Sequence, residues 1–419
     1  MKKSISGALS RRRFLGRGAA LVGAGGLAAI TSSPARAGEP LEVQPWMTSP
    51  GAGLSEHGAL AQYASGVKRA FVRSQPGTTG SGASRTPLEA LEGIITPSAL
   101  HFERHHSGVP DIDPARHRLL IHGMVRRPLV FDIDSLKRYP MVSRIHFIEC
   151  SGNSLQMYSP KPLPLKCGDM HGLVSCSEWT GVPLRILLDE AGIEPGAYWL
   201  VAEGADAASV SRSIPIDKAM DDAMVALFQN GESLRPENGF PVRLLLPGYE
   251  GNMNIKWLRR IKVVPTPAMT KDETSRYTDL QPNGKALMFT FAMGVKSVIT
   301  RPSPGLTLKA PGFWEISGLA WSGSGAIRRV EVSSDGGSNW QEAQLSAPVL
   351  PRALTRFRMP WRWDGRATVL KSRATDETGA VQPTRDALIG EHGSNVIFHY
   401  NAIQAWGVEA NGEVKNVYA

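Results

Sequence analysis

The stretch HFIECSGNS, residues 146–154, ends an apolar, strand-like run with a single cysteine and continues at once into a turn of small and polar residues. A strand that stops at Cys150 presents the thiol at the edge of a sheet, where a ligand can approach. The thiol then has four interpretations: a buried core residue, half of a disulfide, a nucleophile or a metal ligand. The sequence on either side has to decide among them.

Apolar runs alternate with short helical patterns around this stretch, from Thr86 to about Pro267. The expected strands are 117–122, 143–148, 198–202, 241–246 and 254–264, and the expected helices are 134–138 and 184–191. Strands and helices that mix without regular βαβ spacing predict an α+β domain, which we place at residues 86–296.

After Ser297 the pattern changes to short strands separated by Gly, Ser, Pro and Asp. The expected strands are 313–319, 326–332, 340–345 and 367–374, with a turn at 334–337. This pattern predicts an immunoglobulin-like β-sandwich over residues 297–419. Residues 38–85 are rich in Gly, Ser, Pro and Thr, which predicts an N-terminal arm or linker with one short helix near 58–69.

The first 37 residues have the features of an export leader. SRRRFL at 10–15 is a twin-arginine signature, and it precedes a mildly apolar stretch at 19–30 and a small-residue site, ARA, at 35–37. We expect export to the periplasm in the folded state, which is a first indication of a cofactor inserted before export.

Charge and hydropathy after the leader exclude two classes of protein. The chain has 47 Lys and Arg against 38 Asp and Glu, and seven of those basic residues lie in the leader, so the mature chain is close to neutral. Such a balance gives no electrostatic argument for binding nucleic acid. No later segment has the run of about 18 apolar residues that a membrane span needs.

The chain has three cysteines, Cys150, Cys167 and Cys176. The odd number leaves at least one thiol unpaired, and a Cys167–Cys176 bridge stays open. Without a CxxCH motif, covalent haem is not expected.

Residues 101–106, HFERHH, place three histidines and an arginine within six positions. Such a cluster suits a metal or an anion, although a solvated polar loop would have the same composition. Zinc ligands could be His105, His106, Cys150 and His171, but their spacing is not that of a structural zinc site.

Two further alternatives come from other classes. In a cysteine hydrolase, Cys150 would be the nucleophile and His146 or His105 the base. His146 lies four residues before Cys150 on a strand, roughly 13 Å away, which excludes a direct pair. In a non-catalytic binding protein, Cys150 would be structural.

Four motifs in order carry a family resemblance: FERHH with VP at 102–110, ECSGN at 149–153, GFPVR with PG at 239–248, and NIKW at 254–257. In order and spacing they resemble the sulfite oxidase family of molybdenum enzymes, from about Thr86 to the C-terminus. The stretches that resemble the sulfane dehydrogenase branch, which acts in periplasmic thiosulfate oxidation, are HFERHHSGVPDIDP, GLVSCSEWTGVP, PGYEGNMNIKWLRR and GVKSVITRP.

The resemblance implies a molybdopterin enzyme with a dimerisation domain. Cys150 matches the thiolate ligand of molybdenum, and Arg104 and Tyr277 match the residues that flank the substrate. The small residues 151–153 would let a bulky cofactor approach the backbone. The predicted cofactor-binding residues are Phe102, Glu103, Arg104, His105, His106, Asp206, Asn238, Arg243, Asn254, Ile255 and Lys256.

The chain departs from the family pattern at two positions. Asn238 stands where the family has a pterin-contacting histidine, and it can donate a hydrogen bond without carrying charge. Sulfite-oxidising members have an arginine after a tryptophan near the C-terminus, but Trp406 is followed by Gly407 and Val408. The missing cation disfavours free sulfite. Lys166 lies near an anion-binding lysine of the family, but the alignment slips by one residue there.

The resemblance also implies the partners. The substrate would be sulfane sulfur on a carrier protein, and the electron acceptor a c-type cytochrome subunit, because no haem is expected in this chain. Assembly would be a homodimer through the C-terminal domain or a hetero-oligomer with the cytochrome. A dehydrogenase of free sulfite is the alternative.

Overall fold

A computed structural model of the chain describes residues 43–73, 79–394 and 396–418. The chain divides into two units, residues 1–60 and 61–419, and each is considered by itself. The described part of the first unit contains one 3-10 turn, Pro45–Met47. The predicted leader lies outside the described residues. None of the helices in the described ranges is long and apolar enough to cross a membrane.

Three sheets build the α+β region of the second unit. The first joins β1 (Ala70–Arg73), β2 (Gly82–Arg85) and β3 (Glu103–His105). The second has the order β5-β4-β13-β8-β9, with β4 (Leu119–Gly123), β5 (Leu129–Phe131), β8 (Trp199–Gly204), β9 (Ser211–Pro215) and β13 (Leu258–Val264). The third has the order β11-β10-β7-β6 with β12 beside β10, and comprises β6 (Val142–Glu149), β7 (Val174–Pro183), β10 (Met224–Gln229), β11 (Glu232–Ser233) and β12 (Arg243–Leu245).

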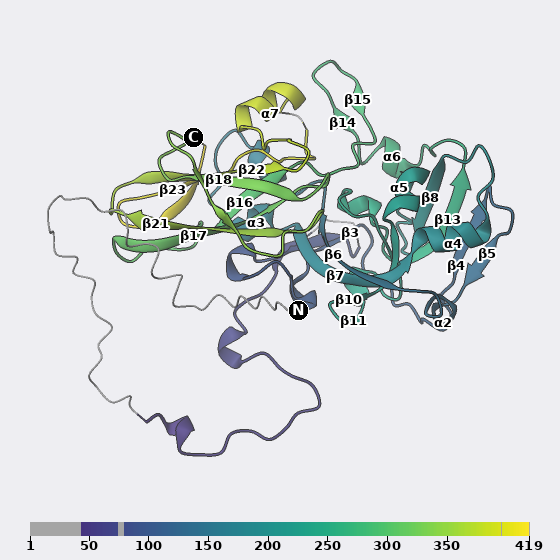
Figure 1. The fold of residues 1–419 in the computed structure, drawn as a ribbon, viewed down its shortest axis with the longest axis horizontal. Helices are drawn as coiled ribbons and strands as arrows, with labels where there is room; N and C mark the ends of the chain where they lie inside the picture. The colour runs from purple at the N-terminus through teal and green to yellow at the C-terminus, as the bar shows by residue number, and fades with distance from the viewer. Residues whose placement is uncertain (1–42, 74–78, 395, 419) are drawn as a thin grey trace, which may run out of the picture. The chain divides into compact units, whose positions relative to one another are not determined.

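Short helices cover and connect these sheets. They are α2 (Ile133–Leu136), α3 (Cys167–His171), α4 (Leu184–Ala191), α5 (Ile216–Asp221) and α6 (Lys271–Thr274). A further helix, α7 (Arg385–His392), belongs to the C-terminal region. Helix α4 forms where its spacing predicts, because Leu184, Leu187 and Leu188 share one buried face. It ends at Gly192, whose φ of 72° few other residues adopt at no cost. Figure 1 shows α4 and α5 beside β8 and β13, with which they share a hydrophobic core.

The C-terminal region is a β-sandwich of two antiparallel sheets. One has the order β16-β17-β21-β20, with β16 (Lys296–Arg301), β17 (Gly312–Trp321), β20 (Gln344–Leu345) and β21 (Thr355–Trp363). The other has the order β19-β18-β22-β23-β24, with β18 (Ile327–Ser333), β19 (Gln341–Glu342), β22 (Thr368–Asp376), β23 (Ala405–Val408) and β24 (Val414–Val417). A hairpin of β14 (Asp279–Leu280) and β15 (Ala286–Leu287) precedes the sandwich. The α+β class followed by a sheet-rich C-terminal region is confirmed.

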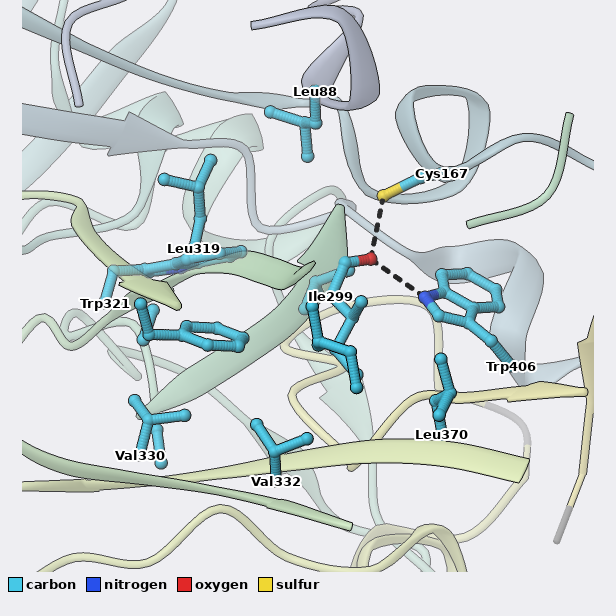
Figure 2. Close-up of a cluster of buried hydrophobic side chains, with 14 of the residues drawn as sticks. Leu88, Cys167, Ile299, Leu319, Trp321, Val330, Val332, Leu370 and Trp406 are labelled. Atoms are coloured by element: carbon cyan, nitrogen blue, oxygen red, sulfur yellow. Dashed lines mark hydrogen bonds between the residues drawn. The ribbon is translucent and has the colours of Figure 1, made fainter. Parts of the chain in front are cut away.

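One hydrophobic cluster continues from the α+β region into the sandwich, as Figure 2 shows. Leu88 and Cys167 of the α+β region pack in it with Ile299 and Trp406 of the sandwich. The carbonyl of Ile299 accepts from the Cys167 thiol (3.8 Å) and from the indole N–H of Trp406 (2.8 Å). The two regions therefore share buried core rather than a wet, separable boundary.

Three predicted elements differ in the structure. The strand expected at 254–264 begins only at Leu258, and the residues before it form a loop in which Trp257 has a φ of 52°. The strand expected at 340–345 is two short strands, β19 and β20, in opposite sheets, because the chain crosses the sandwich at buried Ala343. The helix expected near 58–69 is only a 3-10 turn, Gln62–Ala64.

Candidate functional site

A pocket with an empty volume of about 730 Å³ lies where the predicted site residues meet. It is lined by His101, Phe102, Arg104, His105, His106, Ile148, Cys150, Asp206, Val210, Glu237, Asn238, Arg243, Gly251, Asn252, Asn254, Ile255, Lys256, Trp257 and Tyr277. Every predicted site residue except Glu103 belongs to this lining, although the residues come from separate segments of the chain. The role of each residue stays a prediction.

Cys150 follows the last residue of β6 and is held on both sides by backbone hydrogen bonds. Its N–H donates to the carbonyl of Leu173 (2.9 Å), and its carbonyl accepts from the N–H of Asn153 (2.8 Å). Gly251 passes close behind, since a Cβ there would lie 2.9 Å from the Glu149 carbonyl oxygen. Burial raises the pKa of the Cys150 thiol, and nearby Arg104 opposes that shift. A thiolate at this position therefore needs an additional positive charge, such as a metal ion.

The turn after Cys150 is fixed by buried polar side chains. The amide of Asn153 donates to Oε1 of Glu149 (2.8 Å) and accepts from the N–H of Leu173 (3.0 Å). Ser154 has a φ of 68°, and its hydroxyl lies 2.7 Å from Nδ1 of His171. Residues 151–154 are outside the pocket lining. The expectation that small residues at 151–153 let a cofactor approach the backbone stays a prediction, and the buried side chains here also hold the turn.

Lys256 lies in a chain of polar contacts that leads away from the pocket. Its ammonium donates to Nδ1 of His105 (2.7 Å) and to the carbonyl of Arg104 (3.3 Å). Nε2 of His105 then donates to Oε2 of Glu103 (2.9 Å), and Glu103 also forms an ion pair with Arg69. Burial lowers the pKa of Lys256 well below its ordinary value. An anion in the pocket would favour the charged lysine. Glu103 thus lies outside the pocket lining and contacts the pocket through His105.

Arg243 is a buried cation, with 3% of its surface exposed. Its guanidinium donates to the carbonyls of Asn238 (2.8 Å) and Asn254 (3.0 Å) and lies 5.0 Å from the ring centre of Trp179. Burial lowers its pKa to about 9. Within the described ranges, no carboxylate forms an ion pair with it, and its Nε has no hydrogen-bond partner. A buried guanidinium in this state fits an anionic ligand.

Tyr277 forms the wall of the pocket together with His106. The hydroxyl of Tyr277 lies 2.7 Å from Nε2 of His106. Burial, followed by the charge of Arg104, lowers the pKa of His106 to about 3, so its imidazole is neutral. The guanidinium of Arg212 lies 4.8 Å from the ring centre of Tyr277, and Phe398 of the C-terminal region lies 5.7 Å from it. The aromatic ring is therefore held from both regions of the fold.

Two predicted cofactor-binding residues use their side chains to shape the backbone. Oδ1 of Asn254 accepts from the N–H of Leu246 (2.7 Å), and its Nδ2 donates to the carbonyl of Glu250 (3.1 Å). The amide of Asn238 donates to Oε1 of Gln229 (3.1 Å). These residues line the pocket while their amide groups are already engaged.

The other predicted residues in the lining have simpler surroundings. Phe102 stacks on His101 with ring centres 5.2 Å apart. Asp206 accepts from the hydroxyl of Ser107 (3.4 Å), and Ile255 is buried.

Seven lining residues are not among the predicted site residues: His101, Ile148, Val210, Glu237, Gly251, Asn252 and Trp257. Of these, only His101 was noted in the sequence, as part of the histidine cluster. Arg212 lies beside the pocket against Tyr277 and was also missed. Asn252 has a buried Oδ1 with no hydrogen-bond partner among the described residues. Arg212 is fully buried and pairs with Glu273 (3.0 Å). Trp257 and Asn252 lie within quoted motifs, but nothing in the sequence distinguishes Arg212 from an ordinary strand residue.

The structure removes several alternatives for the cysteines. In the part of the chain that the structure describes, no group of three or more His, Cys, Asp or Glu could hold a metal. His171 is bound to Ser154 and Gln404 in the core, which contradicts the zinc set. His146 contacts the carbonyl of Arg352 instead of the thiol of a hydrolase pair. All three cysteines are free, so the Cys167–Cys176 bridge is absent.

Lys166 and Gly407, the two positions at which the family resemblance suggested anion binding, lie outside the pocket lining. The aliphatic part of the Lys166 side chain packs against Gly305. A Cβ added to Gly305 would lie 3.3 Å from Cγ and Cε of Lys166. A Cβ on Gly407 would lie 2.9 Å from Cγ1 of Val417 on β24. Neither residue is part of the lining. Whether the missing arginine disfavours sulfite stays a prediction.

Comparisons with known proteins agree with this arrangement. Residues 106–271 match the oxidoreductase molybdopterin binding domain, and residues 288–405 match the Mo-co oxidoreductase dimerisation domain. Sulfite oxidase of Gallus gallus is 30% identical over 71% of this chain and 70% of its own length. A nitrate reductase [NADH] of Solanum lycopersicum is 31% identical over 72% of this chain, and only 38% of its own length is covered.

A solved structure extends the likeness. The crystal structure of the sulfane dehydrogenase SoxCD from Paracoccus pantotrophus matches with a TM-score of 0.88 and 46% sequence identity, covering 91% of this chain and all of that chain. The fold and site thus define a molybdopterin-dependent sulfur oxidoreductase. The chain belongs to the sulfite oxidase family.

The residues of the pocket fit the molybdenum cofactor that this family implies. A lone protein thiol, without a three-residue ligand cluster in the described ranges, suits a metal that brings sulfur ligands of its own. Arg243 and Lys256 supply positive charge for the phosphate of a pterin. We therefore expect Cys150 to hold the metal, and the two cations to hold the anionic end of the cofactor.

Proposed function

We propose that the mature chain works in the periplasm and oxidises sulfane sulfur carried on the thiol of a carrier protein during thiosulfate oxidation. Electrons would pass to a c-type cytochrome subunit. The observation that carries this proposal is the 46% identity, over 91% of the chain, to a structure named a sulfane dehydrogenase. The twin-arginine signature at 10–15 supports the location.

The bound cofactor supplies oxygen-atom transfer and accepts two electrons in each step. For each oxygen atom added, the balance is R–S⁻ + H₂O → R–SO⁻ + 2H⁺ + 2e⁻. The cytochrome accepts the two electrons in single steps, and the protons leave to water. This stoichiometry requires an external electron acceptor, because no haem is expected in the chain.

The chain itself positions the reactants. Arg104 lines the pocket beside Cys150 and would hold an anionic sulfur group by charge-assisted hydrogen bonds. If Nε2 of neutral His106 carries the proton, it donates to the oxygen of Tyr277. The hydroxyl hydrogen of Tyr277 is then free to donate to an oxygen atom in the pocket.

The assembly is part of the same proposal. The match to a dimerisation domain at residues 288–405 supports a homodimer through the sandwich. A hetero-oligomer with the cytochrome is the other arrangement, since the similar solved structure is a complex named SoxCD. Light scattering of the native periplasmic complex, combined with a haem stain, separates the two.

Turnover measurements test the proposal. Purified holoenzyme with its cytochrome should reduce that cytochrome faster with a thiosulfate-loaded carrier protein than with sulfite at equal concentration. Equal or faster turnover of sulfite would overturn the assignment of substrate. A Cys150→Ser variant should stay folded and keep its pterin but lose turnover and change its Mo(V) electron paramagnetic resonance signal, and full turnover with an unchanged signal would contradict the role of the thiol.

Dehydrogenation of free sulfite is the second candidate. It is favoured by the similarity to sulfite oxidases and by the cations of the pocket. These cations suit free sulfite as well as an anionic sulfur group attached to a carrier protein. Its signature is saturable sulfite turnover that needs no carrier protein.

A further inference from the structure

A buried ion pair lies directly beneath the turn that carries Cys150. Glu149 and Lys296 are each 1% exposed, and the ammonium of Lys296 lies 3.3 Å from Oε1 of Glu149. The same ammonium donates to the hydroxyl of Ser154 (2.7 Å). The indole N–H of Trp321 donates to Oε2 of Glu149 (2.6 Å).

The members of this group come from both regions of the fold. Glu149 precedes Cys150, and Ser154 ends the turn, whereas Lys296 begins β16 and Trp321 ends β17 of the sandwich. Oε1 of Glu149 also accepts from the side chain of Asn153 inside the turn. Side chains of the sandwich thus bind the turn at its start and at its end.

We infer that Lys296 and Trp321 are positioning residues, which fix the turn so that the Cys150 thiol faces the pocket. The region that matches the dimerisation domain then has a second task, because it sets the geometry of the thiolate ligand. This inference rests on the proposed role of Cys150 as the molybdenum ligand.

We call the group of Glu149, Ser154, Lys296 and Trp321 the brace. Its burial and its hydrogen bonds distinguish it from ordinary apolar packing. A buried ion pair costs desolvation, and removing one partner leaves an uncompensated charge. The pair persists because Glu149 receives donors on both oxygens, and each donor connects to the turn or to the sandwich. Apolar side chains in place of the ion pair would fill the same volume, but they would not fix the direction of the thiol.

Arg356 provides a matched control. It is 2% exposed and also links the sandwich to the α+β region, since its guanidinium donates to the carbonyls of Leu91 and Gly93. Among the described residues its side chain donates to Leu91, Gly93 and Thr300, none of which belongs to the turn. Arg356→Met therefore removes a cation of similar burial between the same two regions without removing a contact to residues 150–154.

The first test measures alkylation of Cys150 in the full-length chain, produced in a host that cannot make the pterin. Iodoacetamide labelling of each cysteine is followed by peptide mass spectrometry. Cys167 and Cys176 have no exposed surface and report any general unfolding. We expect labelling of Cys150 to become about tenfold faster in Lys296→Met, through local opening of the turn, and to stay within about twofold of wild type in Arg356→Met.

The direction of this effect is informative. Loss of the Lys296 charge disfavours a nearby thiolate, so electrostatics alone would slow alkylation. Faster labelling therefore reports a released turn. If Lys296→Met labels all three cysteines, the milder Trp321→Phe decides, because it removes one donor to Glu149 and keeps an aromatic ring.

The second test uses the holoenzyme. The Mo(V) electron paramagnetic resonance signal should change its g-values in Lys296→Met or Trp321→Phe and stay unchanged in Arg356→Met. Wild-type labelling of Cys150 together with an unchanged signal in both brace variants would overturn the inference, as would equal changes in Arg356→Met. Failure of the ligand proposal is separate, since it shows as full turnover and an unchanged Mo(V) signal in Cys150→Ser.

Discussion

Replacing Arg243 by methionine should affect cofactor retention far more than the stability of the cofactor-free protein. In the wild-type chain the guanidinium is buried and lacks a carboxylate partner within the described residues. An anionic cofactor end would provide the missing charge. Methionine has a similar length and removes the charge while filling the space.

The magnitude follows from the pKa of Arg243, which burial lowers from its ordinary value to about 9. At pH 7, below both values, this depression means that burying the cation costs about 5 kcal/mol. The variant avoids that cost but leaves the carbonyls of Asn238 and Asn254 without their donor, at about 1–3 kcal/mol each. We therefore expect the cofactor-free variant to lie between about 3 kcal/mol more stable and about 1 kcal/mol less stable than wild type.

The cofactor-bound state should behave differently, because a charge-assisted hydrogen bond contributes about 1.5–3 kcal/mol. Its loss corresponds to cofactor release that is roughly 10 to 100 times faster. Pterin fluorescence after timed gel filtration measures the release, and denaturant titration measures the cofactor-free stability. Arg356→Met is the control and should release the cofactor at the wild-type rate. A destabilised apoprotein with unchanged pterin release would refute the reasoning.

Three further predictions concern single residues of the pocket. Tyr277→Phe should lower kcat by about 10²-fold at unchanged molybdenum content, because it removes a hydrogen-bond donor near the reacting atoms; an unchanged kcat in steady-state assays would exclude that role. Arg104→Met should raise KM for an anionic sulfur substrate by about tenfold or more, since one charge-assisted contact is lost; the effect should vanish in assays with an uncharged substrate analogue. Burial lowers the pKa of His101 to about 3, so the stability that neutral His101 permits is present above the ordinary value of 6.5 and is lost as the pH falls toward 3. Between pH 7 and pH 5, His101→Asn should therefore lose roughly 2 kcal/mol less stability than wild type, and parallel denaturation curves would contradict this.

The sequence was most informative where local patterns decide the structure. The spacing of Leu184, Leu187 and Leu188 predicts α4 over its full length, and the apolar run before Cys150 predicts β6. The predicted site residues other than Glu103 all line the pocket, whereas Asn252 and Trp257, which lie within the same motifs, were not singled out. Tertiary contacts decided what local patterns could not.

Arg212 and Lys296 illustrate this limit. Both lie in strands whose sequences read as ordinary β-structure, and their burial depends on partners 38 or more positions away, Glu250 and Glu149. Residues 254–257 were predicted to begin a strand because Ile255 and Trp257 are apolar. They form a loop instead, in which the carbonyl of Asn254 accepts from Arg243 and its Oδ1 accepts from the N–H of Leu246. Long-range polar pairing leaves no periodic signal in a single sequence.

The brace beneath Cys150 also orders events during biosynthesis. Trp321 is translated 171 residues after Cys150, which at about 5–20 residues per second corresponds to roughly 10–35 s. Throughout this interval the nascent thiol turn lacks at least one of its two supports from the sandwich. The metal site should therefore reach its final form only after the first two strands of the sandwich, β16 and β17, have been made, so cofactor insertion would follow synthesis of the α+β region.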